Sequence, residues 1–205
     1  MRIGVICSIT LVAASLSAAT AAAQHPTPQQ LFESGQLNAA AQAIAEHRGQ
    51  GRESAGESYL EGLIFTKLNQ PDQAREAFSR LATLGGEPWA PVQASALALL
   101  AGDNAGARDA AQQAAATAPD LSQAHYQLGT VLARFEDWAG SADAFRQAAA
   151  RDPAFAYAHY YAGLAYSRAG RADRTSEHFE RFLRLAPKAP ERPAVETLMR
   201  TLRGR

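Results

Sequence analysis

Residues 124–153 read AHYQLGTVLARFEDWAGSADAFRQAAARDP, and residues 158–187 read AHYYAGLAYSRAGRADRTSEHFERFLRLAP. The second stretch repeats the first after 34 residues and keeps the Ala-His-Tyr start, a glycine, a phenylalanine and the final proline. Upstream, Gly62, Phe65 and Phe78 recover the same spacing after a slip of one residue. A fixed period of this length is typical of a protein built from stacked structural repeats.

Each repeat has the pattern of two amphipathic helices. The first ends near a polar turn such as NQPD or RAGR, and the second ends at APD, RDP or LAP, where proline stops a helix. Gly62, Gly129 and Gly163 fall inside the first helix, where glycine costs about 0.5–1 kcal/mol relative to alanine. We therefore expect the second helix of each repeat to approach these three glycines closely.

This pattern resembles the tetratricopeptide repeat, which has a 34-residue unit with small and aromatic residues at fixed positions. The resemblance implies an all-α fold, a right-handed α–α superhelix of about five helix-turn-helix units with a C-terminal capping helix. The expected units are 24–54, 55–87, 88–121, 122–155 and 156–189, followed by a capping helix at 190–205. Units four and five match the family best, and units one and three match it least.

The first 23 residues read as a secretory signal peptide. Arg2 precedes an apolar run from Ile3 to Leu16, and small residues lead to a cleavage position after Ala23. The alternative is an uncleaved membrane anchor, for which this run is weakly apolar. Cys7, the only cysteine, lies inside this segment, so we expect a cysteine-free mature chain in the periplasm or outside the cell.

The charges of the chain are balanced overall but unevenly distributed. Twenty basic and twenty acidic residues cancel, which argues against a nucleic-acid partner. Residues 168–205 nevertheless hold ten Lys and Arg against five Asp and Glu. This basic C-terminal end is compatible with peripheral contact with an anionic surface or an acidic partner, but a charge cluster on a helix is more often a solvated face.

The resemblance also implies which helix face is free for a partner, because one face of the first helix lines the concave groove in this family. The residues expected on that face are large aromatics and cations that recur between units. They are Tyr59, Lys67, Trp89, Tyr126, Arg134, Tyr157, Tyr160 and Arg168, with Leu63, Thr130 and Leu164 at a neighbouring repeat position. Tyr and Arg suit a binding surface because they combine contact area with a polar tip. The alternative is that each tyrosine packs against the next unit.

The sequence gives no support for catalysis, a cofactor or a metal site. It lacks the phosphate-binding, serine-hydrolase and zinc-protease motifs, and its acidic residues are scattered rather than paired. His125 and His159 occupy equivalent places in consecutive units, where the family has a packing residue, so we interpret both as packing residues.

We therefore expect a non-enzymatic protein-interaction module that holds a protein or peptide partner in its concave groove. An adaptor or assembly factor of the bacterial cell envelope fits the expected export. The alternative is a structural protein that associates with itself through its apolar face. The oligomeric state and the partner are not readable from the residues, because a fold specifies a groove and not its occupant.

Overall fold

The structure is a computed structural model that describes residues 26–203, and this part of the chain is helical throughout, without strands. The signal peptide expected at 1–23 lies outside the described residues. The elements are α1 (Pro28–Glu33), α2 (Leu37–Gly49), α3 (Ala55–Lys67), α4 (Pro71–Ser79), α5 (Leu81–Gly85), the 3₁₀ turn η1 (Glu87–Trp89), α6 (Ala90–Ala101), α7 (Asn104–Thr117), α8 (Ser122–Arg134), α9 (Trp138–Arg151), α10 (Ala156–Arg168), α11 (Ala172–Leu185) and α12 (Arg192–Arg203).

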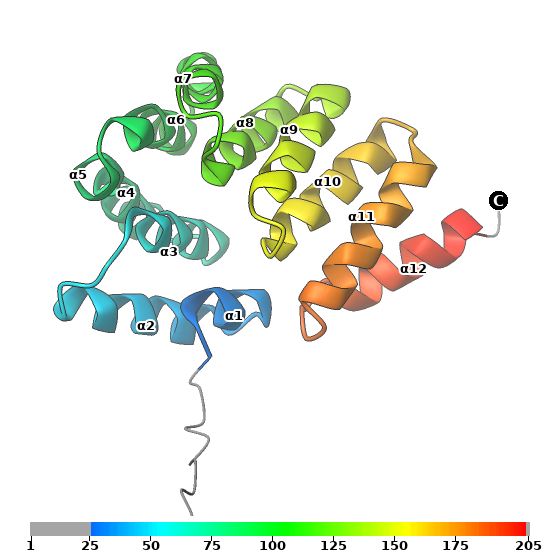
Figure 1. Cartoon of the computed structure of the whole chain (residues 1–205), viewed down its shortest axis with the longest axis horizontal. Helices are drawn as coiled ribbons and strands as arrows, with labels where there is room; N and C mark the ends of the chain where they lie inside the picture. The colour runs from blue at the N-terminus through cyan, green and yellow to red at the C-terminus, as the bar shows by residue number, and fades with distance from the viewer. Residues whose placement is uncertain (1–25, 204–205) are drawn as a thin grey trace, which may run out of the picture.

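Consecutive helices pair as antiparallel hairpins, α3 with α4, α6 with α7, α8 with α9 and α10 with α11 (Figure 1). The turn inside each of these four pairs, and the turn between α1 and α2, contains one residue with a positive φ. These turn residues are Gly35, Asn69, Gly102, Glu136 and Gly170, with φ between 57° and 79°. A left-handed residue is a common way to end a helix, and here it recurs at the repeat spacing.

The close approach expected at the glycines is confirmed. A Cβ atom built on Gly129 would lie 2.8 Å from the ring of Phe145, and one built on Gly163 would lie 2.6 Å from the ring of Phe179. Gly62 faces Phe78 in the same way. The phenylalanine of the second helix thus lies directly on the backbone of the first helix, which leaves no room for a side chain.

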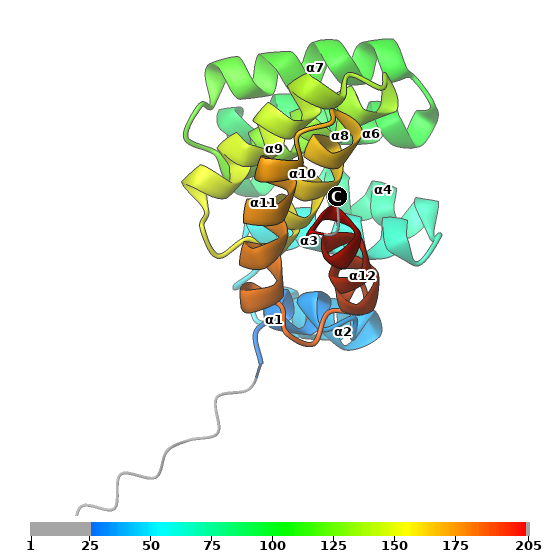
Figure 2. The same ribbon diagram turned by 90° about the vertical axis from the view of Figure 1, so that its right-hand side faces the viewer.

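The helix pairs follow an arc, so that the first and last units approach each other. Figures 1 and 2 show α1 and α2 at the same end of the molecule as α12 and the adjacent end of α11. Phe32 of α1 contacts Tyr157 of α10, with 4.9 Å between ring centroids. Gly35 lies against Pro190, which precedes α12. The superhelix therefore closes on itself.

An ion pair reinforces this closure. Lys67 Nζ, at the end of α3, lies 3.0 Å from Oε1 of Glu191, and the hydroxyl of Tyr157 donates to Oε2 of Glu191 at 2.8 Å. Burial alone would raise the pKa of Glu191, but the hydrogen bonds from Lys67 and Tyr157 hold it below its ordinary value. The carboxylate of Glu191 therefore stays ionised and links the first half of the arc to its C-terminal end.

Helix α12 covers the apolar end of the last pair. Val195 and Met199 are buried against Phe179 and Phe182 of α11. Its opposite face is polar, as is needed where a stack of repeats ends in solvent. Among residues 26–203 no helix combines the length and the hydropathy that crossing a bilayer requires.

Candidate binding site on the concave face

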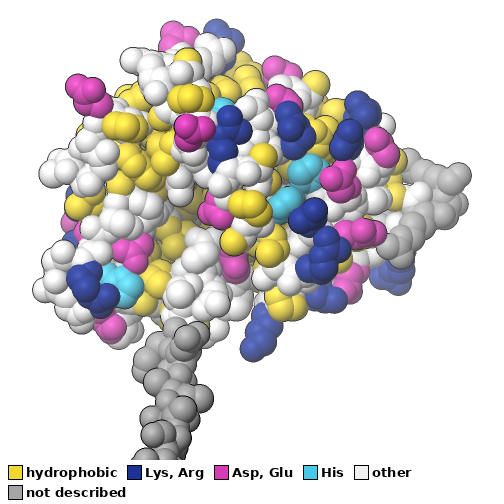
Figure 3. Space-filling view, in the orientation of Figure 1, with side chains coloured by type: hydrophobic (Ala, Val, Ile, Leu, Met, Phe, Trp, Pro, Cys, Tyr) yellow, Lys and Arg dark blue, Asp and Glu magenta, His cyan; other side chains and the backbone are white. Residues whose placement is uncertain are grey.

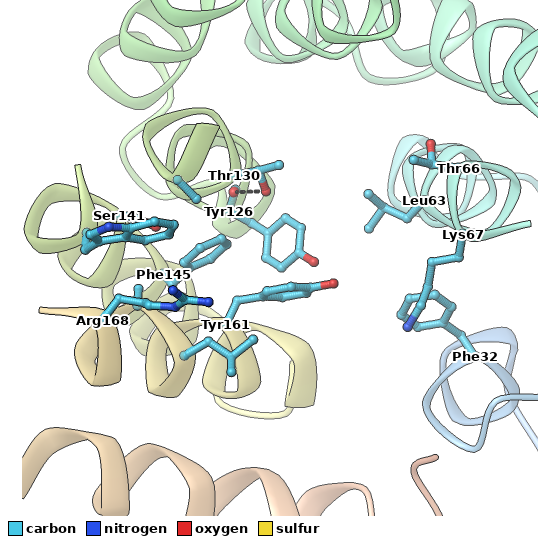
Figure 4. A pocket seen from close by; sticks show the side chains of 14 residues that line it. Phe32, Leu63, Thr66, Lys67, Tyr126, Thr130, Ser141, Phe145, Tyr161 and Arg168 are labelled. Atoms are coloured by element: carbon cyan, nitrogen blue, oxygen red, sulfur yellow. Dashed lines mark hydrogen bonds between the residues drawn. The ribbon is translucent and has the colours of Figure 1, made fainter. Parts of the chain in front are cut away.

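The concave side of the arc contains a cavity of about 400 Å³ between helices that are far apart in the sequence (Figure 4). Helices α1, α3, α8, α9 and α10 contribute to its walls. The lining residues are Phe32, Leu63, Thr66, Lys67, Tyr126, Thr130, Ala133, Trp138, Ser141, Phe145, Tyr161, Leu164, Ala165 and Arg168. This set is mostly apolar and contains no acidic residue.

One wall of the cavity is a cluster of aromatic rings. Tyr126 of α8 makes edge contacts with Phe145 of α9 and Tyr161 of α10, with 5.2 and 5.9 Å between ring centroids. Phe145 and Tyr161 stack on each other at 5.5 Å. Because Phe145 also rests on Gly129, the helix packing of the repeat itself sets the position of this wall.

Two hydroxyl groups of this wall are available to a ligand. Figure 4 shows the phenol oxygens of Tyr126 and Tyr161 directed across the cavity, and neither makes a hydrogen bond with residues 26–203. Burial raises the pKa of Tyr126 well above its ordinary value and, with smaller contributions from Tyr160 and Glu191, raises the pKa of Tyr161 to about 12. Both phenols therefore stay protonated at neutral pH and can donate hydrogen bonds.

The cavity has a cation on each of two opposite sides. Lys67 lies beside Phe32 and is occupied by its ion pair with Glu191. Arg168 lies on the other side in Figure 4, with its guanidinium carbon 5.6 Å from the ring centre of Trp138. Arg168 is exposed and forms no ion pair with the described residues. It is therefore the cation that remains available for a negatively charged group.

The structure brings together only some of the eight residues expected on the concave face. Lys67, Tyr126 and Arg168 line the cavity, and exposed Arg134 ends α8 next to the lining residue Ala133. Tyr157 and half-buried Tyr160 do not line the cavity, and both contact Phe182 of α11.

Tyr59 and Trp89 lie apart from the cavity, in the core of the first half of the arc. Tyr59 donates a hydrogen bond to Oε1 of Gln127 at 2.9 Å, and Trp89 covers Tyr59 and Gly85. With 2% and 9% of their surface exposed, both side chains take the packing role that was the alternative for each aromatic.

Several cavity residues were not among the eight. Phe32 belongs to the short helix α1, and only the closure of the arc brings it there. Trp138 had a detectable signal, because the equivalent positions in the flanking units hold Asn104 and Ala172 and a large aromatic is unusual there. No feature of the sequence singles out Tyr161, because it follows Tyr160 directly and lies between the two faces of the helical wheel.

His125, His159 and His178 are part of the helix packing. His125 and His159 are buried, and Nδ1 of His159 lies 3.1 Å from Nδ1 of His178. Within residues 26–203 no cluster of three or more His, Cys, Asp or Glu side chains has the arrangement of a metal site.

Part of the basic C-terminal end is neutralised locally. Arg174 pairs with Glu177, and Arg192 pairs with Glu196, in addition to the bond between Arg171 and Asp173. Figure 3 shows Lys and Arg side chains interspersed with Asp and Glu over α11 and α12. The surface there is of mixed charge on the face shown.

The comparisons agree with this architecture. The family model of the tetratricopeptide repeat matches residues 157–189, and the comparison with curated proteins gave no match. The thermophilic TPR protein TTC0263 of Thermus thermophilus superposes with a TM-score of 0.59 at 17% identity, over 85% of this chain and 94% of that one.

Two other solved structures are less similar. MamA gives a TM-score of 0.48 at 20% identity, over 78% of this chain and 95% of that one. YrrB, described as a TPR protein with an unusual peptide-binding site, gives 0.46 at 18% identity, over 78% and 83%. Among these three structures it is the superposition on TTC0263 that shows a shared fold, and at 17% identity it shows no more than the fold.

Proposed function

We propose that this chain binds a partner polypeptide through its concave face and acts without catalysis. Its fold, shared with a TPR protein, and the repeat model that matches residues 157–189 support this proposal. The export signal expected at residues 1–23 favours a role as an adaptor or assembly factor in the bacterial cell envelope. Stacks of helical repeats commonly use their concave surface for binding.

The observation that carries this proposal is a rim of cations beside the concave cavity. Lys67, Arg134 and Arg168 are the last residues of α3, α8 and α10. Their repeat position is equivalent, and Arg134 and Arg168 come from consecutive units at one edge of the concave face, whereas Lys67 lies across the cavity from Arg168. Since the cavity lining has no acidic residue, this edge suits an acidic segment of a partner. Arg134 and Arg168 are exposed and carry the proposed contact, because Lys67 is held by Glu191.

The rim cations can contribute to stability as well as to binding, and an experiment has to distinguish these two roles. A cation at the C-terminus of a helix also stabilises that helix by about 0.3–1 kcal/mol through the helix dipole. Stability and binding must therefore be measured on the same variants. Replacing the buried Tyr126 is unsuitable as a first test, because its ring contacts Phe145, Phe155 and Tyr161 and its loss would disturb the core.

The test is partner capture from the envelope fraction, followed by titration with the acidic segment of the captured protein. The double variant Arg134→Glu/Arg168→Glu should weaken binding at least tenfold, and the salt dependence of the remaining binding should decrease. The control Arg52→Glu/Arg200→Glu changes the net charge equally at exposed positions elsewhere and should bind as the wild type does. Equal binding by both double variants would refute the assignment of the rim.

Self-association is tested on the same protein. Light scattering that gives the monomer mass, 21.8 kDa for the full chain, at every concentration contradicts the alternative of a self-associating structural protein. A mass that increases with concentration supports that alternative.

A further inference from the structure

The cavity has walls on two opposite sides of the arc. Helix α1 and residues 190–191 close the arc at the side opposite α8 and α9, and Phe32 of α1 forms part of the lining. Its volume of about 400 Å³ falls in the range of about 300–1,000 Å³ that is usual for small-molecule sites.

The polar groups in this cavity are few and directed inward. Tyr126 is 4% exposed, yet its hydroxyl lacks a hydrogen-bond partner among residues 26–203. The Tyr126 hydroxyl is not among the fully buried unpaired side-chain atoms of these residues, so it is accessible from the cavity and can donate to a bound molecule in place of water. Tyr161 presents a second unpaired hydroxyl from the adjacent helix.

The hydroxyls of the neighbouring small residues are already used. Ser141 donates to the carbonyl oxygen of Gly129 at 2.9 Å, and Thr130 donates to the carbonyl oxygen of Tyr126 at 3.0 Å. Thr66 donates to the carbonyl oxygen of Gly62 at 2.8 Å. Donation to a ligand therefore falls to the two phenols and to Arg168.

The charge of the lining favours an anion. Arg168 has no acidic partner among the described residues, and its guanidinium lies over Trp138 at the edge of the cavity. The aromatic rings and the side chains of Leu63 and Leu164 line the cavity, which extends between Arg168 and Lys67. An apolar body fits this space, and an anionic group fits its Arg168 end.

We propose that the cavity binds a small organic acid with an aromatic or alicyclic body. Its anionic group pairs with Arg168, its body lies against Trp138, Phe145 and Tyr161, and a second oxygen accepts hydrogen bonds from Tyr126 and Tyr161. The two proposals share Arg168, but they are tested apart, because Arg134 lies outside the cavity lining and belongs to the rim alone.

The test uses the fluorescent anion 8-anilinonaphthalene-1-sulfonate as the reporter, displaced by a panel of aryl and alicyclic carboxylates, each paired with its uncharged methyl ester. At least one carboxylate should displace the reporter with a Kd below about 1 mM, and its ester should bind at least tenfold more weakly. Near-UV circular dichroism verifies that the folded protein is the species that binds.

Three variants locate the site. Ala133→Trp, which fills the cavity from α8, should abolish displacement, whereas Ala116→Trp on the exposed face of α7 should leave it unchanged. Arg168→Gln should remove the preference for the acid over the ester. Tyr126→Phe/Tyr161→Phe keeps both rings and should weaken binding about tenfold.

The proposal is overturned if every carboxylate fails to bind below about 1 mM, or if Ala133→Trp binds as well as Ala116→Trp does. It is equally overturned if Arg168→Gln still prefers the acid. The single variant Arg134→Glu separates this proposal from the proposed function, because it should weaken peptide binding while displacement of the reporter from the cavity stays unchanged.

Discussion

Replacing Gly163 by alanine tests the contact on which the repeat packing depends. The new Cβ would lie 2.6 Å from two ring atoms of Phe179, well inside ordinary van der Waals contact at 3.4–4 Å. Phe179 has none of its surface exposed, so its ring has no free space to enter. Overpacking of this kind costs about 1–3 kcal/mol, and the gain from removing a helical glycine returns about 0.5–1 kcal/mol. We expect a net loss of about 0.5–2 kcal/mol in the free energy of unfolding.

The matched control is Gly49→Ala. Gly49 lies in α2 with an ordinary helical φ, and a Cβ there would meet nothing within 4 Å. The same chemical change should therefore stabilise the protein by about 0.5 kcal/mol, because only the helical preference is altered. The two substitutions are predicted to have opposite signs.

The assay is urea unfolding followed by far-ultraviolet circular dichroism, with the midpoints compared at equal slopes. The cycle is completed with Phe179→Leu, since the Gly163→Ala substitution should cost less once the ring is gone. A coupling of about 1 kcal/mol between the two positions is expected. If Gly163→Ala stabilises the protein as Gly49→Ala does, the close approach does not limit this position and the packing argument is wrong.

Three further predictions concern the turn, the histidines and the closure of the arc. Glu136 has φ 57° without being glycine, which costs about 1–2 kcal/mol, so Glu136→Gly should raise the thermal midpoint despite the added freedom of the unfolded chain. Burial and the neighbouring His178 lower the pKa of His159 to about 4, below the unfolded value of 6.5. Stability should therefore be complete above pH 6.5 and decrease as the pH falls towards 4, by up to about 2–3 kcal/mol, and His159→Gln should flatten this dependence in urea titrations. Glu191→Gln weakens the link to Lys67 and should speed amide hydrogen exchange in α1 about tenfold while α9 is unchanged; unchanged exchange in α1 would show that the apolar contacts alone close the arc.

The helix pairs and their contacts could be predicted because they depend on local periodicity. A helical glycine and a phenylalanine 16 residues later, as at Gly129 and Phe145, recur in three units and describe a contact inside one hairpin. Proline and polar turn residues indicate where each helix ends. These patterns involve residues that are close together in the sequence, so they can be recognised without knowing how the rest of the chain folds.

The candidate site was only partly predictable, because a helical wheel gives the direction of a side chain and not its neighbours. Tyr126 points to the concave side as expected, but Phe155 at the end of its own unit and Tyr161 of the next unit cover most of it. Tyr157 was expected to face a groove, and Phe32 and Glu191 bury it completely. Three of the eight expected residues line the cavity. Two of these three, Lys67 and Arg168, are the last residues of α3 and α10, and a side chain at the end of a helix is less easily covered by a neighbouring helix.

The sequence by itself determined the repeat, the antiparallel pairs and the packing of phenylalanine on glycine, because these contacts lie within about 34 residues. Only the tertiary structure decided that the arc closes, that Phe32 reaches Tyr157 and that residues from α1, α3, α8, α9 and α10 line one cavity. The curvature of the arc is the sum of small rotations between successive units. Those rotations depend on how whole helix pairs pack, and no single residue pattern encodes their sum.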